Sequence, residues 1–179
     1  RFATSATAEL DTIRHAIEHH TLFSVTDRQG RIIDVNEGFC RMSGYSRDEL
    51  IGQNHRKLNS GRHPRAFWAE MWERVERGER WRAEVCNRAK DGSLYWVDST
   101  IVPYPGRDGR PEKYVSIRFD ITRQKLAEEE AARQRERAQE QHDELRTILD
   151  SVPALIFYKD DENTIIDLNQ PAAETIGLP

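Results

Sequence analysis

Side chains capable of ligand binding or proton transfer gather between residues 54 and 88. His55 and His63 can titrate near neutral pH, Asn87 can both donate and accept hydrogen bonds, and Trp72 and Trp81 offer flat apolar faces. Taken singly, each has an ordinary structural explanation, such as a surface histidine, a strand end or a core tryptophan. Their meaning therefore depends on the elements that position them.

The chain carries none of the residue constellations that catalysis requires. It has no nucleophile beside a base, no metal-ligand spacing and no phosphate-binding loop, and its glycines favour hairpin turns. Cys40 and Cys86 are far apart, which indicates two reduced thiols in a cytoplasmic protein. We therefore expect neither enzyme activity nor a metal site.

Bulk composition limits the size of the fold and the kinds of partner. With 179 residues, the chain is long enough for one domain of about 100–150 residues and a smaller part. A charged content of 32% and a mean hydropathy of -0.81 predict that part of it is a solvated helix. The net charge of -4 argues against nucleic acid as a partner, and no apolar run is long enough to span a membrane.

Two hydrophobic periods alternate along the first 122 residues. Residues 1–20 have apolar side chains at helical spacing and predict an N-terminal helix. Two short strands, a helical middle with a capping box at Ser46–Glu49, and three longer strands follow. The fold class is therefore α+β, with one antiparallel sheet over residues 21–122 and its helices on one face. The expected strands cover residues 22–26, 31–35, 81–88, 93–102 and 114–121, and the longest helix between them covers 64–79.

The composition changes sharply over residues 123–150, which predict a linker helix. This segment has no Gly or Pro and is rich in Ala, Glu, Gln and Arg. Ala131, Ala138, Leu145 and Val152 recur every seven residues, and Ala127 and Ile148 fit a second row at the same spacing, which Gln134 and Gln141 interrupt. A solvated single helix and a helix paired with its copy in a homodimer therefore both remain open.

An internal repeat indicates a second copy of the domain. A shift of 133 residues aligns Asp27 with Asp160, Asn36 with Asn169, and the tripeptide at 32–34 with that at 165–167. The alignment has no gaps. Residues 151–179 therefore predict the start of a second, truncated domain, and we expect the chain to be part of a larger protein.

The stretches TDRQGRIIDVNEGFCRMSGYSRDELIGQNHR, NRAKDGSLYWVDSTIVP and YVSIRFDIT together resemble a PAS domain. The likeness covers residues 13–125 and begins again near residue 145. It implies the PAS fold, a five-stranded antiparallel sheet with helices on one face, flanked by an N-terminal helix and a C-terminal linker helix.

Within this family, residues 52–88 resemble the FAD-binding redox and oxygen sensors, such as the aerotaxis transducer, the nitrogen-fixation flavoprotein regulator and the methane-oxidation sensor kinase. The resemblance implies FAD, with Trp72 and Trp81 beside the ring, Asn87 at its polar edge and Arg62, His63 and Arg88 near the pyrophosphate. The full set of implied cofactor residues is Ser24, Asn54, His55, Arg62, His63, Trp72, Trp81, Asn87 and Arg88.

Two departures separate the chain from light-sensing PAS domains of the LOV type. His55 stands where those domains carry a reactive cysteine, and Arg118 stands where they carry a glutamine. A thiol–flavin adduct at that position is therefore excluded. The second copy has Phe157 in place of Ser24, and flavin binding is not extended to it.

The resemblance implies a sensor that reports redox state or oxygen to an output domain of the same protein through the linker helix. His55 and Ser24 are the candidates to follow the hydrogen-bonding change at the flavin ring. Two alternatives stay open, a ligand-free PAS module that dimerises and relays a signal, and a haem sensor with His63 as axial ligand.

Overall fold

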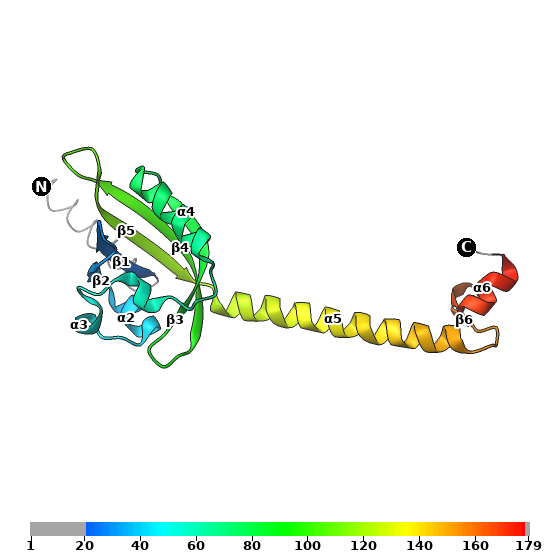
Figure 1. The fold of residues 1–179 in the computed structure, drawn as a ribbon. Coiled ribbons are helices and arrows are strands. Elements are labelled where there is room, and N and C mark those ends of the chain that lie inside the picture. The colour runs from blue at the N-terminus through cyan, green and yellow to red at the C-terminus, as the bar shows by residue number, and fades with distance from the viewer. Residues whose placement is uncertain (1–20, 178–179) are drawn as a thin grey trace, which may run out of the picture. The chain divides into compact units, whose positions relative to one another are not determined.

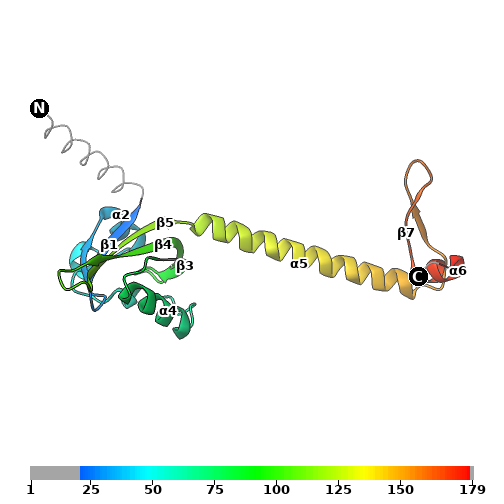
Figure 2. The ribbon, with the colours of Figure 1, turned by 90° about the horizontal axis from the view of Figure 1, so that it is seen from above.

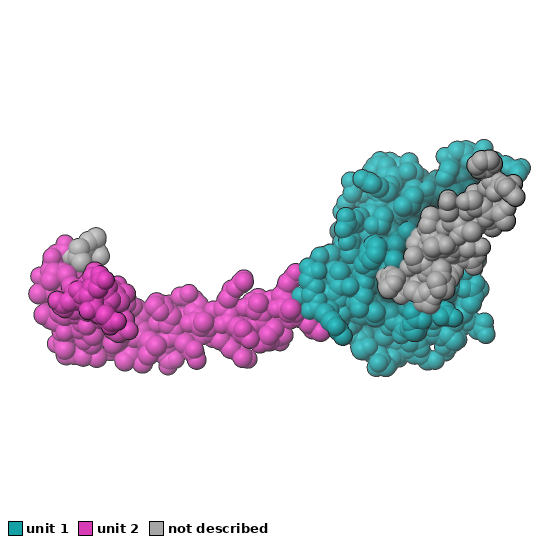
Figure 3. Space-filling model, turned by 180° about the vertical axis from the view of Figure 1, so that it is seen from behind, with its two compact units in different colours: residues 1–125 teal, residues 126–179 magenta. Residues whose placement is uncertain are grey.

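The computed structural model describes residues 21–177. The predicted N-terminal helix of residues 1–20 lies outside the described residues. The chain divides into two compact units, residues 1–125 and 126–179, which Figure 3 shows in different colours. The fold that positions the candidate site belongs to the first unit.

The first unit is built on one five-stranded antiparallel sheet (Figure 1). Its strand order is β2-β1-β5-β4-β3, so the last strand in sequence lies in the middle, between the first strand and the fourth. This confirms the predicted α+β class. The strands are β1 (Leu22–Asp27), β2 (Ile32–Val35), β3 (Trp81–Arg88), β4 (Leu94–Pro105) and β5 (Pro111–Asp120).

One face of this sheet is closed off from solvent, as the burial of alternate residues shows. On β5, the side chains of Tyr114, Ser116 and Arg118 are buried, whereas Phe119 is 53% exposed. The same alternation places Val97 and Ser99 of β4 on the buried face. This face therefore carries polar as well as apolar side chains.

The elements between β2 and β3 cover the buried face (Figures 1 and 2). The capping box predicted at Ser46 and Glu49 is present at the start of the helix that spans Arg47–Leu50. The long helix of this region begins after Pro64 and buries Met71 and Val75 against the sheet. The elements are α2 (Glu37–Ser43), α3 (Arg47–Leu50), the 3-10 helix η1 (His55–Leu58) and α4 (Arg65–Glu76).

Helix α5 (Thr122–Ser151) starts two residues after β5 and is tied to the sheet by its first turn. The backbone N–H of Trp96 donates to Oγ1 of Thr122 at 3.0 Å. Lys125 forms an ion pair with Glu84 of β3, and its ammonium lies 5.7 Å from the ring centroid of Trp96. The beginning of α5 is therefore fixed to the outer face of β3 and β4.

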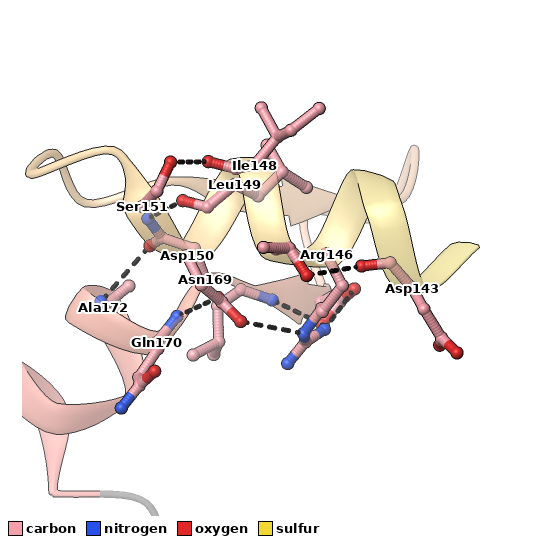
Figure 4. A network of polar contacts seen from close by, with 12 residues as sticks. Asp143, Arg146, Ile148, Leu149, Asp150, Ser151, Asn169, Gln170 and Ala172 are labelled. Carbon is pink, nitrogen blue, oxygen red and sulfur yellow. Dashed lines mark hydrogen bonds and ion pairs between the residues drawn. The ribbon is translucent and has the colours of Figure 1, made fainter. Parts of the chain in front are cut away.

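The second unit repeats the start of the first, with β6 (Phe157–Lys159), β7 (Ile165–Leu168) and α6 (Gln170–Ile176). In the first unit, the Asn36 side chain accepts from Phe23 N and donates to Thr21 O. Asn169 makes the equivalent bonds to Ile156 N and Ala154 O, each partner shifted by 133 residues. Asn169 also donates to Leu149 O near the end of α5 (Figure 4).

Among the helices of residues 21–177, none is long and apolar enough to cross a membrane.

Candidate functional site

A cavity of about 570 Å³ lies between the buried face of the sheet and the elements that cover it. Strand residues form its floor, α4 forms one wall, and η1 with the β1–β2 turn forms another. Its lining comprises Thr26, Arg28, Gln29, Gly30, Asn54, His55, Arg56, Asn59, Trp68, Met71, Trp72, Val75, Glu76, Trp81, Val85, Asn87, Ser99, Ile101, Tyr114, Ser116 and Arg118.

Aromatic rings make up much of the apolar lining. Trp72 of α4 meets Tyr114 of β5 edge to face, with ring centroids 5.6 Å apart. A Cβ on Gly30 would lie 3.1 Å from the Trp72 ring, so the turn needs glycine there for space as well as for its φ of +74°. The Trp72 ring is therefore packed between the β1–β2 turn and strand β5, and it also lines the cavity.

Arg118 is the most unusual residue of the cavity, because it carries a charged side chain and is only 4% exposed to solvent. Its guanidinium donates to Oγ of Ser24 at 2.9 Å and lies 2.9 Å from Nε2 of His55. It also stands 5.5 Å from the centroid of the Phe39 ring. Burial lowers the pKa of Arg118 to about 10, which leaves it charged at neutral pH.

His55 is neutral in this arrangement. Burial, followed by the positive charge of Arg118, lowers the pKa of His55 to about 3. Arg118 can only donate, so Nε2 of His55 must accept and Nδ1 must carry the proton. Ser24, Arg118 and His55 thus form one hydrogen-bonded group that joins β1, β5 and η1.

Two buried polar atoms of the described residues have no hydrogen-bond partner, Nε1 of Trp68 and the hydroxyl oxygen of Tyr95. Trp68 lines the cavity and Tyr95 does not. The Asn87 amide, 4% exposed and also lining the cavity, makes no hydrogen bond to another described residue. An unpartnered indole N–H and an unpartnered amide in one cavity are suited to a ligand with polar edges.

Five of the nine sequence-predicted residues lie in the cavity lining: Asn54, His55, Trp72, Trp81 and Asn87. Ser24 does not line the cavity, but it is fully buried and its hydroxyl accepts a hydrogen bond from Arg118. The structure therefore brings the predicted ring-binding residues together.

The three residues predicted near a pyrophosphate lie outside the lining. Nε2 of His63 accepts a hydrogen bond from Cys86 N at 2.8 Å, and Arg88 donates to Ser60 O at 2.8 Å. The Arg62 guanidinium lies 5.9 Å from the centroid of the Trp96 ring. These contacts fasten the loop before α4 to strands β3 and β4, a role that the sequence resemblance did not reveal.

The lining residues that sequence reasoning missed include three arginines, Arg28, Arg56 and Arg118, and one tryptophan, Trp68. Alternation on β5 was the available signal for Arg118, because Tyr114 and Ser116 point the same way. Spacing on α4 was the signal for Trp68, four residues before Trp72. Arg28 and Arg56 are exposed, and neither pattern marks them.

Within residues 21–177, no cluster of His, Cys, Asp and Glu side chains is suited to a metal ion.

The PAS domain family matches this chain twice. One match covers residues 20–123, and a second covers residues 143–179. The crystal structure of the PAS domain of a protein from Colwellia psychrerythraea is 31% identical, with a TM-score of 0.57. That likeness covers 64% of this chain and 98% of the other.

Two curated relatives extend the likeness. The nitrogen fixation regulatory protein of Klebsiella pneumoniae is 32% identical over 143 residues, which are 80% of this chain and 28% of that protein. The aerotaxis receptor of Escherichia coli K12 is 40% identical over 107 residues, which are 60% of this chain and 21% of the receptor. The chain therefore spans less than a third of either relative.

Proposed function

The chain belongs to the PAS domain family and is a sensory module of signal transduction, and we propose that its first domain binds FAD in the cavity. In this proposal the bound flavin reports redox state or oxygen to an output domain of the parent protein. The module works in the cytoplasm and does no catalysis of its own.

The observation that carries the proposal is the pair of unpartnered donors in the cavity wall. Nε1 of Trp68 has no acceptor, and the amide of Asn87 has no partner among the described residues. A ligand-free relay module would leave the Trp68 N–H desolvated and unpaired, at a cost of roughly 1–3 kcal/mol. A flavin ring supplies carbonyl and N–H groups along one edge and apolar faces for Trp72 and Trp81.

Two exposed arginines of the cavity lining support FAD, the dinucleotide form of the flavin, as the ligand. Arg28 and Arg56 line the cavity, and both keep part of their side chains in solvent. Arginine is suited to binding phosphate oxygens. We therefore assign the pyrophosphate of FAD to these two residues instead of Arg62, His63 and Arg88, whose contacts lie along β3 and β4.

Haem is a weaker candidate for this cavity. The sequence offered His63 as the axial ligand, but its Nε2 already accepts a hydrogen bond from Cys86 N. His55, the histidine that lines the cavity, uses Nε2 with Arg118. Neither Nε2 atom is therefore available to an iron without breaking a bond within the protein.

FAD would supply reversible electron transfer, and the protein side of the signal runs along β5. Arg118 meets the cavity, and Asp120 lies two residues further on. Oδ1 of Asp120 accepts a hydrogen bond from Thr122 N at 2.9 Å, at the first residue of α5. A change in the Arg118 hydrogen bonds is thereby passed to the start of α5, which we propose as the output element.

The first test is the visible spectrum of the purified chain, followed by titration with FAD if the protein is colourless. The expected result is a flavin spectrum, or saturable uptake of FAD. A colourless protein that takes up no added FAD would contradict the proposal, and a dimeric protein with that property would favour the ligand-free module. A Soret band would favour haem.

Variants locate the flavin in the cavity. Trp72→Ala and Asn87→Ala should each weaken FAD binding by about tenfold or more, or ~1.4 kcal/mol. Gln139→Ala on the exposed surface of α5 is the control and should bind FAD like the wild type. Circular dichroism would establish that each variant is folded. Unchanged FAD content in both cavity variants would remove this cavity from the proposal.

A further inference from the structure

Arg118 is a buried cation without a counterion among the described residues. Its partners are the hydroxyl of Ser24, the neutral ring of His55 and the face of Phe39, none of which carries negative charge. No ion pair joins it to any carboxylate of residues 21–177. The acidic residue in the cavity lining, Glu76, is exposed on α4.

Such an arrangement is costly unless something in the cavity compensates for it. A buried charge is ordinarily paired, because removing it from water is unfavourable by several kcal/mol. Two hydrogen bonds satisfy part of the guanidinium but leave its charge unneutralised. The nearest place where an opposite charge can enter is the cavity that Arg118 lines.

We propose that Arg118 makes the cavity selective for negative charge, so that it binds the reduced, anionic form of a flavin ring more tightly than the oxidised form. This inference rests on the proposed function and goes beyond it, because it assigns to one residue the control of the reduction potential. Arg118 acts by contact with the bound ring and not as a catalytic group.

The charge balance explains the preference. An oxidised isoalloxazine ring is neutral, and the gain of two electrons and one proton leaves it with one negative charge. In the test, dithionite supplies the electrons through a redox dye and the buffer supplies the proton. A buried cation stabilises the charged product, which raises the reduction potential.

The experiment measures the midpoint potential of FAD bound to the full chain, after its spectrum has shown that FAD is bound. The wild type should lie above free FAD in the same buffer. Arg118→Gln should shift the preference toward the oxidised form by at least tenfold, which is about 30 mV for a two-electron couple. Arg118→Lys keeps the charge and should retain most of the wild-type potential.

Arg135→Gln removes the same charge from an exposed position on α5 and should leave the potential unchanged. If Arg118→Gln binds no FAD, the comparison of the wild type with free FAD decides.

A wild-type potential at or below that of free FAD would overturn the inference, as would equal potentials for Arg118→Gln and wild type. Arg118→Lys at the level of Arg118→Gln would also overturn it, because it would assign the effect to the hydrogen bonds and not to charge. A chain that takes up no flavin removes the proposed function, and this inference falls with it.

Discussion

Trp68 and Tyr95 carry the same defect, a buried donor without a partner, in two different places. Trp68 lines the cavity, whereas Tyr95 of strand β4 belongs to the hydrophobic core and does not line the cavity. A ligand can repair the first defect but has no access to the second. The two residues therefore separate a binding role from a structural one.

Trp68→Phe keeps the aromatic ring and removes the N–H group. If the indole donates to FAD, the dissociation constant should rise roughly five- to tenfold, the value of one hydrogen bond. The free energy of unfolding of the ligand-free protein should stay the same or rise by ~1 kcal/mol, because an unpaired buried group is lost. Titration with FAD and chemical denaturation measure the two quantities.

Tyr95→Phe is the matched control for this prediction. It should raise the free energy of unfolding of the ligand-free protein by about 1 kcal/mol and leave the affinity for FAD unchanged. Equal losses of affinity in both variants would show that Trp68 acts through packing and not through its N–H group.

His55 should make stability depend on acid. Its pKa is about 3 in the fold, against 6.5 in an unfolded chain, so only the unfolded state gains a proton between these values. The contribution of His55 to the free energy of unfolding is therefore complete above pH 6.5. It falls as the pH drops toward 3, by up to ~1.4 kcal/mol per pH unit. The slope is an upper limit, because His55 keeps some solvent contact.

Denaturation of the wild type and His55→Asn between pH 7 and pH 4.5 measures this contribution. The variant should lose less stability than the wild type over that interval, by about 1–2 kcal/mol. Identical pH profiles would mean that His55 is protonated in the folded protein and that its bond to Arg118 is not maintained.

The candidate site was only partly predictable from the sequence, and the reason differs from residue to residue. Trp72 and Asn87 were found because they lie at matching positions in a known pattern. His63 and Arg88 occur in the same pattern, but their polar atoms turn to backbone groups of neighbouring segments. Such contacts depend on how a loop packs against a strand, and the spacing of residues in the sequence does not predict that packing.

At the scale of elements, Asn36 is the joint between β1, β2 and α2. Its Oδ1 accepts from Phe23 N at 3.0 Å and from Phe39 N at 2.9 Å, while Nδ2 donates to Thr21 O at 2.8 Å. Asn169 repeats this joint in the second unit. The repeat visible in the sequence is therefore a repeat of hydrogen bonds.

Asn36→Ala should lower the free energy of unfolding of the first unit by roughly 2–3 kcal/mol, since it removes a helix cap and two further bonds. Asn36→Asp keeps the acceptor and loses the donor, so it should cost about half as much. Denaturation followed by tryptophan fluorescence measures both, because Trp68, Trp72, Trp81 and Trp96 all lie in the first unit. Equal costs would assign the joint to the Nδ2 donor alone.

The positions of the helices and strands were more predictable from the sequence than the pairing of the strands in the sheet. Strands β3 and β4 and the capping box at Ser46 follow from local alternation and turn residues. The pairing of β1 with β5 joins residues more than 85 positions apart, such as Ser24 and Ser116. Local patterns do not encode such a pairing, and it is this pairing that brings Arg118 to Ser24.

At the scale of the whole molecule, helix α5 is the element suited to joining two copies of the chain. It runs for 30 residues and buries none of those described. A helix this polar either stays solvated or pairs with a second copy. We propose the second arrangement, a homodimer in which Ala131 and Ala138 face their counterparts.

Ala138→Glu tests this proposal, with Ala132→Glu as its matched control outside the seam. A glutamate at 138 would place two negative charges against each other in the dimer, so the dissociation constant should rise by about tenfold or more. The same substitution at 132 faces solvent and should have little effect. Sedimentation equilibrium over a range of protein concentrations measures both constants. A wild type that is monomeric throughout would favour the solvated helix, and equal effects at 132 and 138 would place the dimer contact elsewhere.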